Sequence, residues 1–564
     1  MKMKMALLVA TAFAVAAPAH AAQTLKWAHW YDKSVLGTTN KSGDQLCTAN
    51  CTVAPVFNAS GPVVLGFEAN NQYQNAALGR NFVPPDTMGA VGTTQYMVTL
   101  NGSIGIYDKY TGAALTPVFN DNAFWQAAGL NGTSGDPRVM FNAQMNRWVT
   151  IAFGSNVKDL QIAVSDTDDA LGPWKAVRFE GYGGLPGIGG GIADYPTLAM
   201  DTNAIYIGTN NFAPTTPGAG ATFKGTTLNV IPIDSIFAAG GPTVANMTQF
   251  ETPYPGTFED RGYAIQGVNS TSASSTGNVF SSSLYNFDTL TYTIDGLSSS
   301  SATGASRGDV VYMGEAGYTG AGAGRQPAVN NPAAQRVIDT LDDRVSSSVY
   351  ESNGYIFAVH TVNPTGDAAG DYARVRILVM DAATQTLVDQ YDIGTGDYDY
   401  YQGSLAVNAD GTIVVGFNRS GLNPTDGKIQ FKAMVFTADD NGQLRLHSGE
   451  LLLKESLTDE YHLGSPVGGA PSGRQRWGDY SQVSLDPTDP NRFYLIGQWA
   501  REPNNAANGH PGGTGFHRWS TWVSVVDAGF VPEPSTWVML ILGFGMIGGA
   551  MRRQRAQTVR IAYA

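Results

Sequence analysis

Residues 476–499 carry the clearest copy of a repeat that runs along most of the chain. An acidic loop leads into an alternating strand, a turn rich in Asp, Pro and Asn follows, and a second apolar strand ends at Trp499. Weaker copies begin near residues 85, 135, 193, 262, 343 and 401. The alternation of apolar and polar residues between regular turns is typical of antiparallel β-strands. A repeat that contains several strands predicts a radial or linear array of small sheets.

The distribution of side-chain size within the repeat favours a radial array. Small residues such as Gly89, Ala199 and Ser346 occupy the leading strand, which suits a position crowded around a central axis, and bulkier aromatic residues follow. The 67 glycines and the low charged fraction of 14% favour short strands joined by turns over helices. The sequence therefore predicts an all-β fold, a β-propeller of seven blades, over residues 61–530.

The seventh copy also contains Asp486-Pro487-Thr488-Asp489-Pro490-Asn491-Arg492-Phe493-Tyr494. This turn resembles the one that links the inner two strands of a blade in BNR and sialidase-like propellers. Residues 165–174 are faintly similar to the Asp-box of those proteins, although the spacing of the Ser, Asp, Gly and Trp positions departs from it. The resemblance implies an architecture and no activity, because one fold serves many functions.

Acidic and aromatic residues recur where each leading strand begins. In a propeller these positions gather around one mouth of the central channel, so we expect a polar, aromatic-edged rim that binds a carbohydrate or an acidic glycan. A structural interpretation stays open, in which each Asp accepts backbone N–H groups and holds the turn of its own blade. The candidate rim residues are Asp136, Arg138, Asp194, Tyr195, Asp343, Arg344, Tyr400, Tyr401, Trp477, Asp479 and Tyr480.

No catalytic residue and no cofactor is predicted. A sialidase-like mechanism needs several arginines around the substrate carboxylate and a Tyr/Glu nucleophile pair. Arg138, Arg344, Arg419 and Arg476 could supply cations, but the sequence does not place the pair. Asp397, Asp399 or the repeated aspartates of the rim could bind calcium, but no stretch of the sequence matches an EF-hand loop. Zinc catalysis is not indicated either, because the seven His lack an H-E-x-x-H spacing.

The N-terminus predicts export through the Sec machinery. Residues 1–21 combine a basic start, an apolar run and the small-x-small sequence Ala19-His20-Ala21, which is typical of a signal peptide. Residues 22–60 form a leader of undetermined structure. Cys47 and Cys51 are the only cysteines, and a disulfide between them would suit an oxidising compartment while constraining only a small loop.

The C-terminus carries the most specific motif of the chain. Val531-Pro532-Glu533-Pro534-Ser535-Thr536-Trp537 leads into an apolar run with Gly543-Phe544-Gly545 and ends at Arg552-Arg553-Gln554-Arg555. Residues 531–555 resemble the PEP-CTERM protein-sorting signal, which is also catalogued as an ice-binding protein C-terminal domain. The resemblance implies that an exosortase in the inner membrane recognises the tail. The protein would then reach the cell surface or matrix of a Gram-negative bacterium that makes exopolysaccharide.

The physical properties of the tail agree with a membrane segment. Residues 537–551 are apolar enough for a short transmembrane helix, and the arginines after it place residues 556–564 on the cytoplasmic side. A plain membrane anchor without processing is the alternative.

The charge of the chain bears on its partners. The formal net charge of −13 makes nucleic acid an unsuitable partner. The predicted partners are the Sec machinery, the exosortase and an exopolysaccharide. The leading functional hypothesis is non-enzymatic binding of exopolysaccharide or partner proteins at the cell surface. A glycoside hydrolase or lyase of the sialidase-like propeller type and a purely structural matrix protein are the alternatives.

Overall fold

The structure is a computed structural model, and it describes residues 51–58, 60–133, 135–182, 191–213, 222–254, 259–272, 277–327, 336–367, 370–459, 475–510, 517–530, 544, 546–548 and 551–552. The predicted signal peptide 1–21, the leader up to residue 50 and the extension 556–564 lie outside the described residues.

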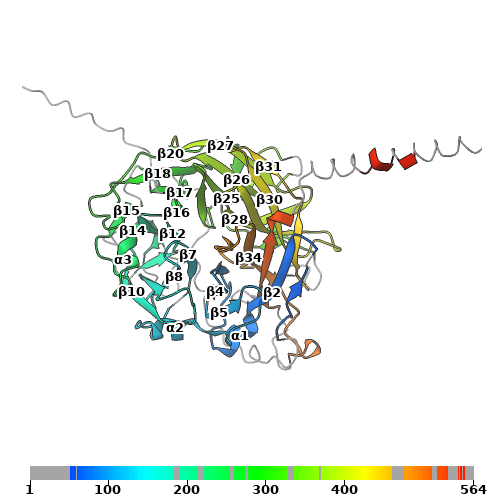
Figure 1. The fold of residues 1–564 in the computed structure, drawn as a ribbon, viewed down its shortest axis with the longest axis horizontal. Coiled ribbons are helices and arrows are strands. Elements are labelled where there is room, and N and C mark those ends of the chain that lie inside the picture. The colour runs from blue at the N-terminus through cyan, green and yellow to red at the C-terminus, as the bar shows by residue number, and fades with distance from the viewer. Residues whose placement is uncertain are drawn as a thin grey trace, which may run out of the picture.

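The described strands form seven antiparallel blades arranged in a ring, with a parallel contact that joins blades 4 and 5 into one sheet (Figure 1). From the axis outward, blade 1 consists of β3 (Met88–Val91), β4 (Gln95–Leu100), β5 (Ser103–Asp108) and β6 (Phe119–Asn120), and blade 2 of β7 (Arg138–Asn142), β8 (Arg147–Phe153), β9 (Asp159–Ser165) and β10 (Trp174–Glu180). Blade 3 consists of β11 (Ile192–Asp194) and β12 (Ala199–Met200), which both pair with β13 (Ala204–Phe212), then β14 (Phe223–Pro232) and β15 (Thr248–Pro253). Blade 4 consists of β16 (Tyr263–Asn269), β17 (Asn278–Ser282), β18 (Thr289–Asp295), β19 (Ser306–Arg307) and β20 (Val311–Tyr312).

The remaining blades follow the same order. Blade 5 consists of β24 (Val349–Ser352), β25 (Tyr355–Pro364), β26 (Arg374–Asp381) and β27 (Thr386–Ile393), with β21 (Tyr318–Thr319) beside β25. Blade 6 consists of β28 (Tyr398–Val407), β29 (Thr412–Gly421), β30 (Gln430–Ala438), β31 (Leu444–Leu446) and β32 (Leu451–Glu455), and blade 7 of β33 (Gln482–Leu485), β34 (Arg492–Ala500), β35 (Trp519–Asp527), β2 (Val63–Asn71) and β1 (Val56–Phe57). A ribbon of β22 (Gly324–Arg325) and β23 (Arg336–Ile338), the helices α1 (Gln72–Ala77), α2 (Asp121–Ala127) and α3 (Ile233–Ile236), and the 3₁₀ turns η3 (Ala506–Asn508) and η4 (Ala528–Phe530) complete the described elements.

The prediction of an all-β propeller is confirmed, and the small residues of the leading strands have a specific role. A Cβ atom on Gly267 in β16 would lie 2.4 Å from a side-chain atom of Tyr206 in the preceding blade. A Cβ atom on Gly92, just after β3, would lie 2.4 Å from the Trp148 ring of the following blade. The glycines therefore let neighbouring blades pack face to face, and the apolar core lies between adjacent sheets.

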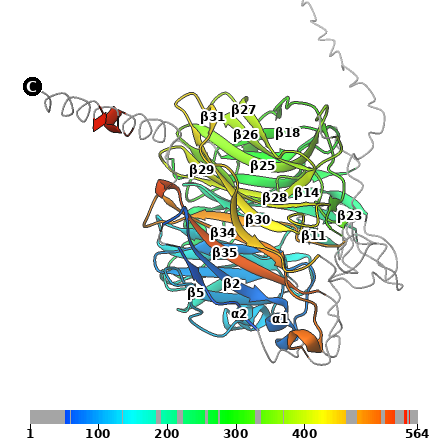
Figure 2. The same ribbon diagram turned by 90° about the vertical axis from the view of Figure 1, so that its right-hand side faces the viewer.

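The ring is closed by a strand from the N-terminal side, which the sequence analysis did not assign to the seventh blade. β2 pairs antiparallel with β35, with Phe67 opposite Val523. In both views the blue N-terminal strands lie beside the orange C-terminal strands (Figures 1 and 2). A buried ion pair joins the two ends, because Arg501 Nη1 lies 3.0 Å from Glu68 Oε1. The last blade is thus built from both ends of the propeller chain, and β2 covers the edge that β35 would otherwise expose.

The predicted helix 537–551 lies outside the described residues except at five positions. Phe544, residues 546–548 and Met551 are helical, and their apolar side chains are exposed. Among the residues that the structure describes, no helix is both long and apolar enough to cross a membrane.

Candidate functional site

Several of the candidate rim residues meet at one end of the axis, where they form a buried plug. Arg138 donates through Nε to Pro196 O at 3.0 Å and through Nη1 to Ser346 O at 3.3 Å, and its guanidinium lies 3.6 Å from the centre of the Tyr480 ring. The Tyr195 hydroxyl donates to Asp479 O at 3.2 Å. These contacts connect blades 2, 3, 5 and 7 across the axis. Arg138 is 2% exposed, and Tyr195 and Tyr480 are each 1% exposed, so a ligand would have to displace the plug to reach them.

Of the four arginines that could have bound a substrate carboxylate, Arg138 contacts backbone carbonyls and the Tyr480 ring, and the other three are already paired with carboxylates of the chain. Arg344 donates two hydrogen bonds to Asp342, at 2.7 and 2.8 Å. Although burial alone would lower the pKa of Arg344, the Asp342 carboxylate raises that pKa well above its usual value. Arg476 is hydrogen-bonded to Asp479, and Arg419 lies 3.1 Å from Glu450. These cations are therefore neutralised within the fold.

The repeated aspartates bind neighbouring parts of the ring rather than only their own turns. Asp343 accepts hydrogen bonds from the hydroxyls of Tyr263, at 2.6 Å, and Tyr318, at 2.9 Å. Asp136 has a left-handed backbone (φ 51°), and its N–H donates to Asn101 Oδ1 of blade 1 at 2.7 Å. Asp194 ends β11 and is half-buried. Asp343, through its carboxylate, and Asp136, through its backbone, thus connect neighbouring blades, and the role of the repeated aspartate position stays a prediction.

The remaining aromatic candidates are buried, and their polar groups have partners. Tyr400 donates to Glu450 Oε1 at 2.6 Å, and the Tyr401 hydroxyl lies 3.0 Å from Ser420 Oγ. Trp477 Nε1 donates to Asn418 Oδ1 at 3.1 Å. None of the predicted rim residues lines the cavity at the other end of the axis.

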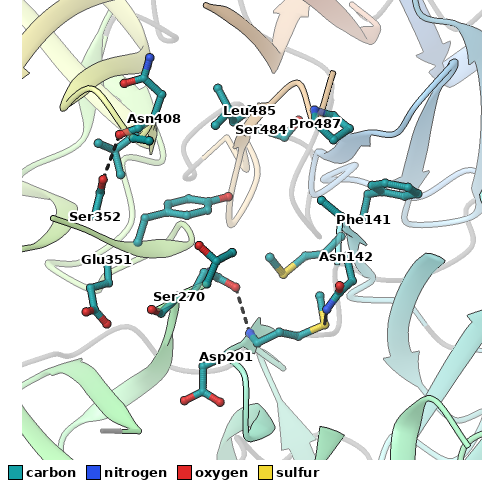
Figure 3. A pocket seen from close by; sticks show the side chains of 18 of the residues that line it. Phe141, Asn142, Asp201, Ser270, Glu351, Ser352, Asn408, Ser484, Leu485 and Pro487 are labelled. Carbon is teal, nitrogen blue, oxygen red and sulfur yellow. Dashed lines mark hydrogen bonds between the residues drawn. The ribbon is translucent and has the colours of Figure 1, made fainter. Parts of the chain in front are cut away.

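That cavity has a volume of about 590 Å³ and lies where the inner strands end and turn outward (Figure 3). Every blade contributes to its wall. Because its size falls within the range of small-ligand pockets, it is the strongest candidate site among the described residues. Representative lining residues, one from each blade in order, are Val91, Asn142, Met200, Asn269, Tyr350, Asn408 and Ser484.

Most of the lining side chains that can form hydrogen bonds are neutral amides and hydroxyls. Tyr350 connects blade 5 to blade 7, since its hydroxyl donates to Val483 O at 3.4 Å and accepts from Gln482 Nε2 at 3.3 Å. Burial raises the pKa of Tyr350 to about 12, so the phenol stays neutral. Ser352 donates to Asn408 O at 2.9 Å (Figure 3).

Two acidic residues line the cavity, Asp201 from blade 3 and Glu351 from blade 5, and their carboxylates have different hydrogen-bond partners. Asp201 accepts from the backbone of Asn203 and Ala204, at 2.7 and 2.8 Å, and from the Tyr206 hydroxyl at 2.7 Å. Glu351 Oε2 is buried without a hydrogen-bond partner. Burial raises the pKa of Glu351, and the charge of Asp201 raises it further against the opposing effect of Ser270. Among the described residues that line the cavity, none is Lys, Arg or His.

No described group of three or more His, Cys, Asp or Glu side chains is placed to hold a metal ion. Asp399, one of the residues considered for calcium, instead accepts hydrogen bonds from Arg325 Nη1 at 2.9 Å and from Ala373 N at 3.0 Å. Cys51 is disulfide-bonded. Cys47 lies outside the described residues, so the pairing of the two cysteines stays a prediction.

The sequence pattern did not point to the cavity, although the residues of the cavity lie in the same repeats. Its positions are the last residues of each leading strand, such as Asn269, Tyr350 and Ser484, only a few residues after the aspartates that drew attention. The signal that could have found them is the alternation itself, because an inner strand that faces the axis presents side chains at both of its ends.

Comparison with known proteins identifies the tail. Residues 530–555 match the PEP-CTERM protein-sorting motif. The chain therefore carries a PEP-CTERM sorting motif, as the resemblance of its C-terminus predicted, and this motif implies export and exosortase-dependent sorting. The matched span contains the predicted motif residues Pro532, Glu533, Pro534, Trp537, Gly543, Phe544, Gly545, Arg552, Arg553 and Arg555.

Solved structures similar to the chain are distant. A protein of unknown function from Dyadobacter fermentans is 11% identical, with a TM-score of 0.33, and the match covers 84% of this chain and 98% of that one. An α-L-arabinofuranosidase from Fusarium graminearum is 10% identical (TM-score 0.33; 79% and 94% covered), and a Trypanosoma rangeli sialidase is 12% identical (TM-score 0.30; 68% and 52% covered). No curated protein sequence matches the chain. These similarities are too low to assign an activity.

Proposed function

We propose that this exported propeller binds an exopolysaccharide at the cell surface or in the matrix, without cleaving it, through the cavity at the ends of the inner strands. The observation that carries the proposal is the cavity of about 590 Å³, to which all seven blades contribute. The sorting motif supplies the setting, because proteins with such tails are characteristic of bacteria that make exopolysaccharide.

The chemistry of the wall suits a hydroxyl-rich ligand without acidic groups. Side-chain amides and hydroxyls, such as those of Asn142, Ser270 and Ser484, can donate to and accept from sugar hydroxyls. Methionine and tyrosine side chains supply apolar surface. An acidic glycan would meet the carboxylates of Asp201 and Glu351 with no lining cation to offset them, so the acidic-glycan hypothesis is the less favourable one.

The same wall argues for binding over hydrolysis. Most glycoside hydrolases use two carboxyl groups, one acting as an acid and one as a nucleophile or base. Asp201 is occupied by hydrogen bonds from its own turn and from Tyr206. Glu351 is the lining carboxylate that has an unpartnered oxygen. A pair of available carboxylates is therefore lacking among the described lining residues.

Obstruction of the cavity mouth tests this proposal. Ala143 and Ala409 are exposed lining residues on blades 2 and 6, so tryptophan at both positions narrows the mouth without disturbing a buried contact. The full-length protein, purified in a mild detergent because of its apolar tail, is incubated with the producing bacterium's exopolysaccharide. Retention on the polymer and the appearance of new chain ends are both recorded. Ala383→Trp, at an exposed turn of blade 5 outside the cavity, is the matched control.

We expect the wild-type protein to be retained and no new chain ends to form. The double variant should lose about tenfold in affinity, about 1.4 kcal/mol, while the control changes little. New chain ends that disappear in Glu351→Gln would show a hydrolase or lyase instead. Full retention of the double variant would place the binding surface elsewhere, and no retention of the wild type would leave a structural matrix protein.

A further inference from the structure

The chain leaves the propeller at the same end of the axis as the cavity. β35 ends at Asp527, which pairs with Arg492, the first residue of β34. The next residue, Ala528, donates its N–H to Asn491 O at 2.8 Å. Asn491 belongs to the turn between β33 and β34, and Pro487 of the same turn lines the cavity (Figure 3). The C-terminal tail therefore begins at the cavity end of the propeller and not at the plug end.

The connection between the propeller and the predicted membrane helix is too short to reverse this arrangement. Six residues, 531–536, separate η4, which ends at Phe530, from the apolar run 537–551. Even when fully extended, a stretch of this length spans only roughly 20 Å. The strand β35 has nine residues and is about 30 Å long. The connection cannot pass along the blade and bring the plug end to the bilayer.

We propose that the anchored protein holds its cavity end toward the bilayer and its plug end outward, so that a polymer enters the cavity through the gap between propeller and membrane. The orientation rests on the predicted helix 537–551, and its consequence for binding rests on the proposed function. A bulky polysaccharide is hindered in this gap, because its chain has to fit beside the bilayer to engage the cavity. Detaching the propeller from the helix removes that obstacle, so attachment to the membrane regulates access to the site.

Energy transfer from a fluorophore on the propeller to an acceptor lipid tests the orientation. The full-length protein is reconstituted in vesicles of phosphatidylethanolamine and phosphatidylglycerol, with a thiol-reactive fluorophore on Ala409→Cys or on Thr425→Cys. Both positions are exposed on blade 6, in the connections at opposite ends of β29. Since β29 has ten residues, the two labels lie about 30 Å apart along the strand, and transfer from the cavity-end label should be at least about twofold stronger. The unsubstituted chain, whose Cys51 is disulfide-bonded, measures background labelling.

A longer connection provides the matched control. Insertion of roughly 40 Gly and Ser residues after Phe530 gives a root-mean-square reach of about 35 Å, so the two labels should then transfer about equally. Stronger transfer from Thr425→Cys, or equal transfer from both labels without the insertion, would overturn the proposed orientation. A difference that survives the insertion would contradict the argument from length, because the surface of the propeller itself would then set the orientation.

A cleavable connection tests the consequence for binding. Residues 531–536 are replaced by a protease recognition sequence of the same length. The affinity for a labelled fragment of the producing bacterium's exopolysaccharide is measured on the vesicles and again after cleavage. We expect binding on the vesicles to be at least about threefold weaker, because the bilayer limits the approach of the polymer. Equal affinities would contradict regulation by attachment and leave glycan binding intact. Absence of binding in both states would overturn the proposed function, while energy transfer would still decide the orientation.

Discussion

Individual charged residues in this propeller act mainly as connections between blades, and the buried pair of His360 and Glu315 shows how. His360 Nε2 lies 2.9 Å from Glu315 Oε2, and both side chains are fully buried. Burial opposes protonation of His360, but the adjacent Glu315 carboxylate outweighs it and raises the pKa of His360 above 6.5. Burial also opposes ionisation of Glu315, but His360 outweighs it and lowers the pKa of Glu315 from 4.5 to about 2. The pair therefore joins blade 5 to the segment after blade 4 as an ion pair.

The stability that this pair contributes depends on pH in a defined direction. Because the pKa of His360 is raised on folding, its contribution is complete below pH 6.5 and is lost as pH rises through the folded value. Because the pKa of Glu315 is lowered, its contribution is complete above pH 4.5 and is lost as pH falls towards 2. We expect His360→Gln to destabilise the protein by about 3 kcal/mol between these limits and by clearly less at about pH 9. Calorimetric unfolding of both proteins at the two pH values is the check, and an equal effect at both would contradict the account.

A second prediction concerns the turn in which the resemblance to BNR propellers lies. Lys109 Nζ is 2.7 Å from Asp486 Oδ1, with side chains 0% and 1% exposed, and it also donates to Thr488 Oγ1 at 2.8 Å. Asp486→Asn leaves a buried ammonium without its counter-charge and should cost about 3–5 kcal/mol of unfolding free energy. Asp489, three residues on, pairs with Arg492 at an exposed position, so Asp489→Asn should cost less than about 1 kcal/mol. Denaturant unfolding of both variants measures the difference, and similar losses would show that Asp486 has no special role.

At the scale of elements, the closure of the ring by β2 leads to a truncation experiment. β2 contributes Leu65 and Phe67 to the core between blades 7 and 1, and its Glu68 binds Arg501. A chain that begins at Thr52 keeps this strand, whereas one that begins at Gln72 loses it and leaves β35 as an exposed edge. We expect cooperative unfolding of the longer chain and aggregation or loss of the cooperative transition in the shorter one. Equal melting temperatures for the two chains would show that β2 is dispensable.

The sequence pattern predicts the contacts that are local in the chain and not those between distant segments. The seven leading strands could be predicted because each repeats the same alternation and turn. The pairing of β2 with β35 could not, since it joins residues more than 400 positions apart and no local signal specifies the partner. The sequence placed Arg138 and Tyr195 at the start of inner strands. Whether they face solvent or are buried depends on what crosses the axis, and here Ser346 O accepts hydrogen bonds from both.

For the whole molecule, the two ends of the axis have different roles. One end is occupied by the arginine–tyrosine plug, which connects blades across the ring. The other holds the cavity lined by all seven blades. The sorting motif at residues 530–555 implies export and sorting by an exosortase. Under the proposed function, the propeller would connect the cell surface to its matrix by binding the polysaccharide.

The most direct measurement is a crystal structure of the protein with a fragment of the producing bacterium's exopolysaccharide. The account predicts sugar density in the cavity at the ends of the inner strands, beside lining residues such as Asn142, Asn408 and Ser484. Sugar density at the opposite end, with Arg138, Tyr195 and Tyr480 displaced from the plug, would contradict the account and restore the rim first expected from the sequence.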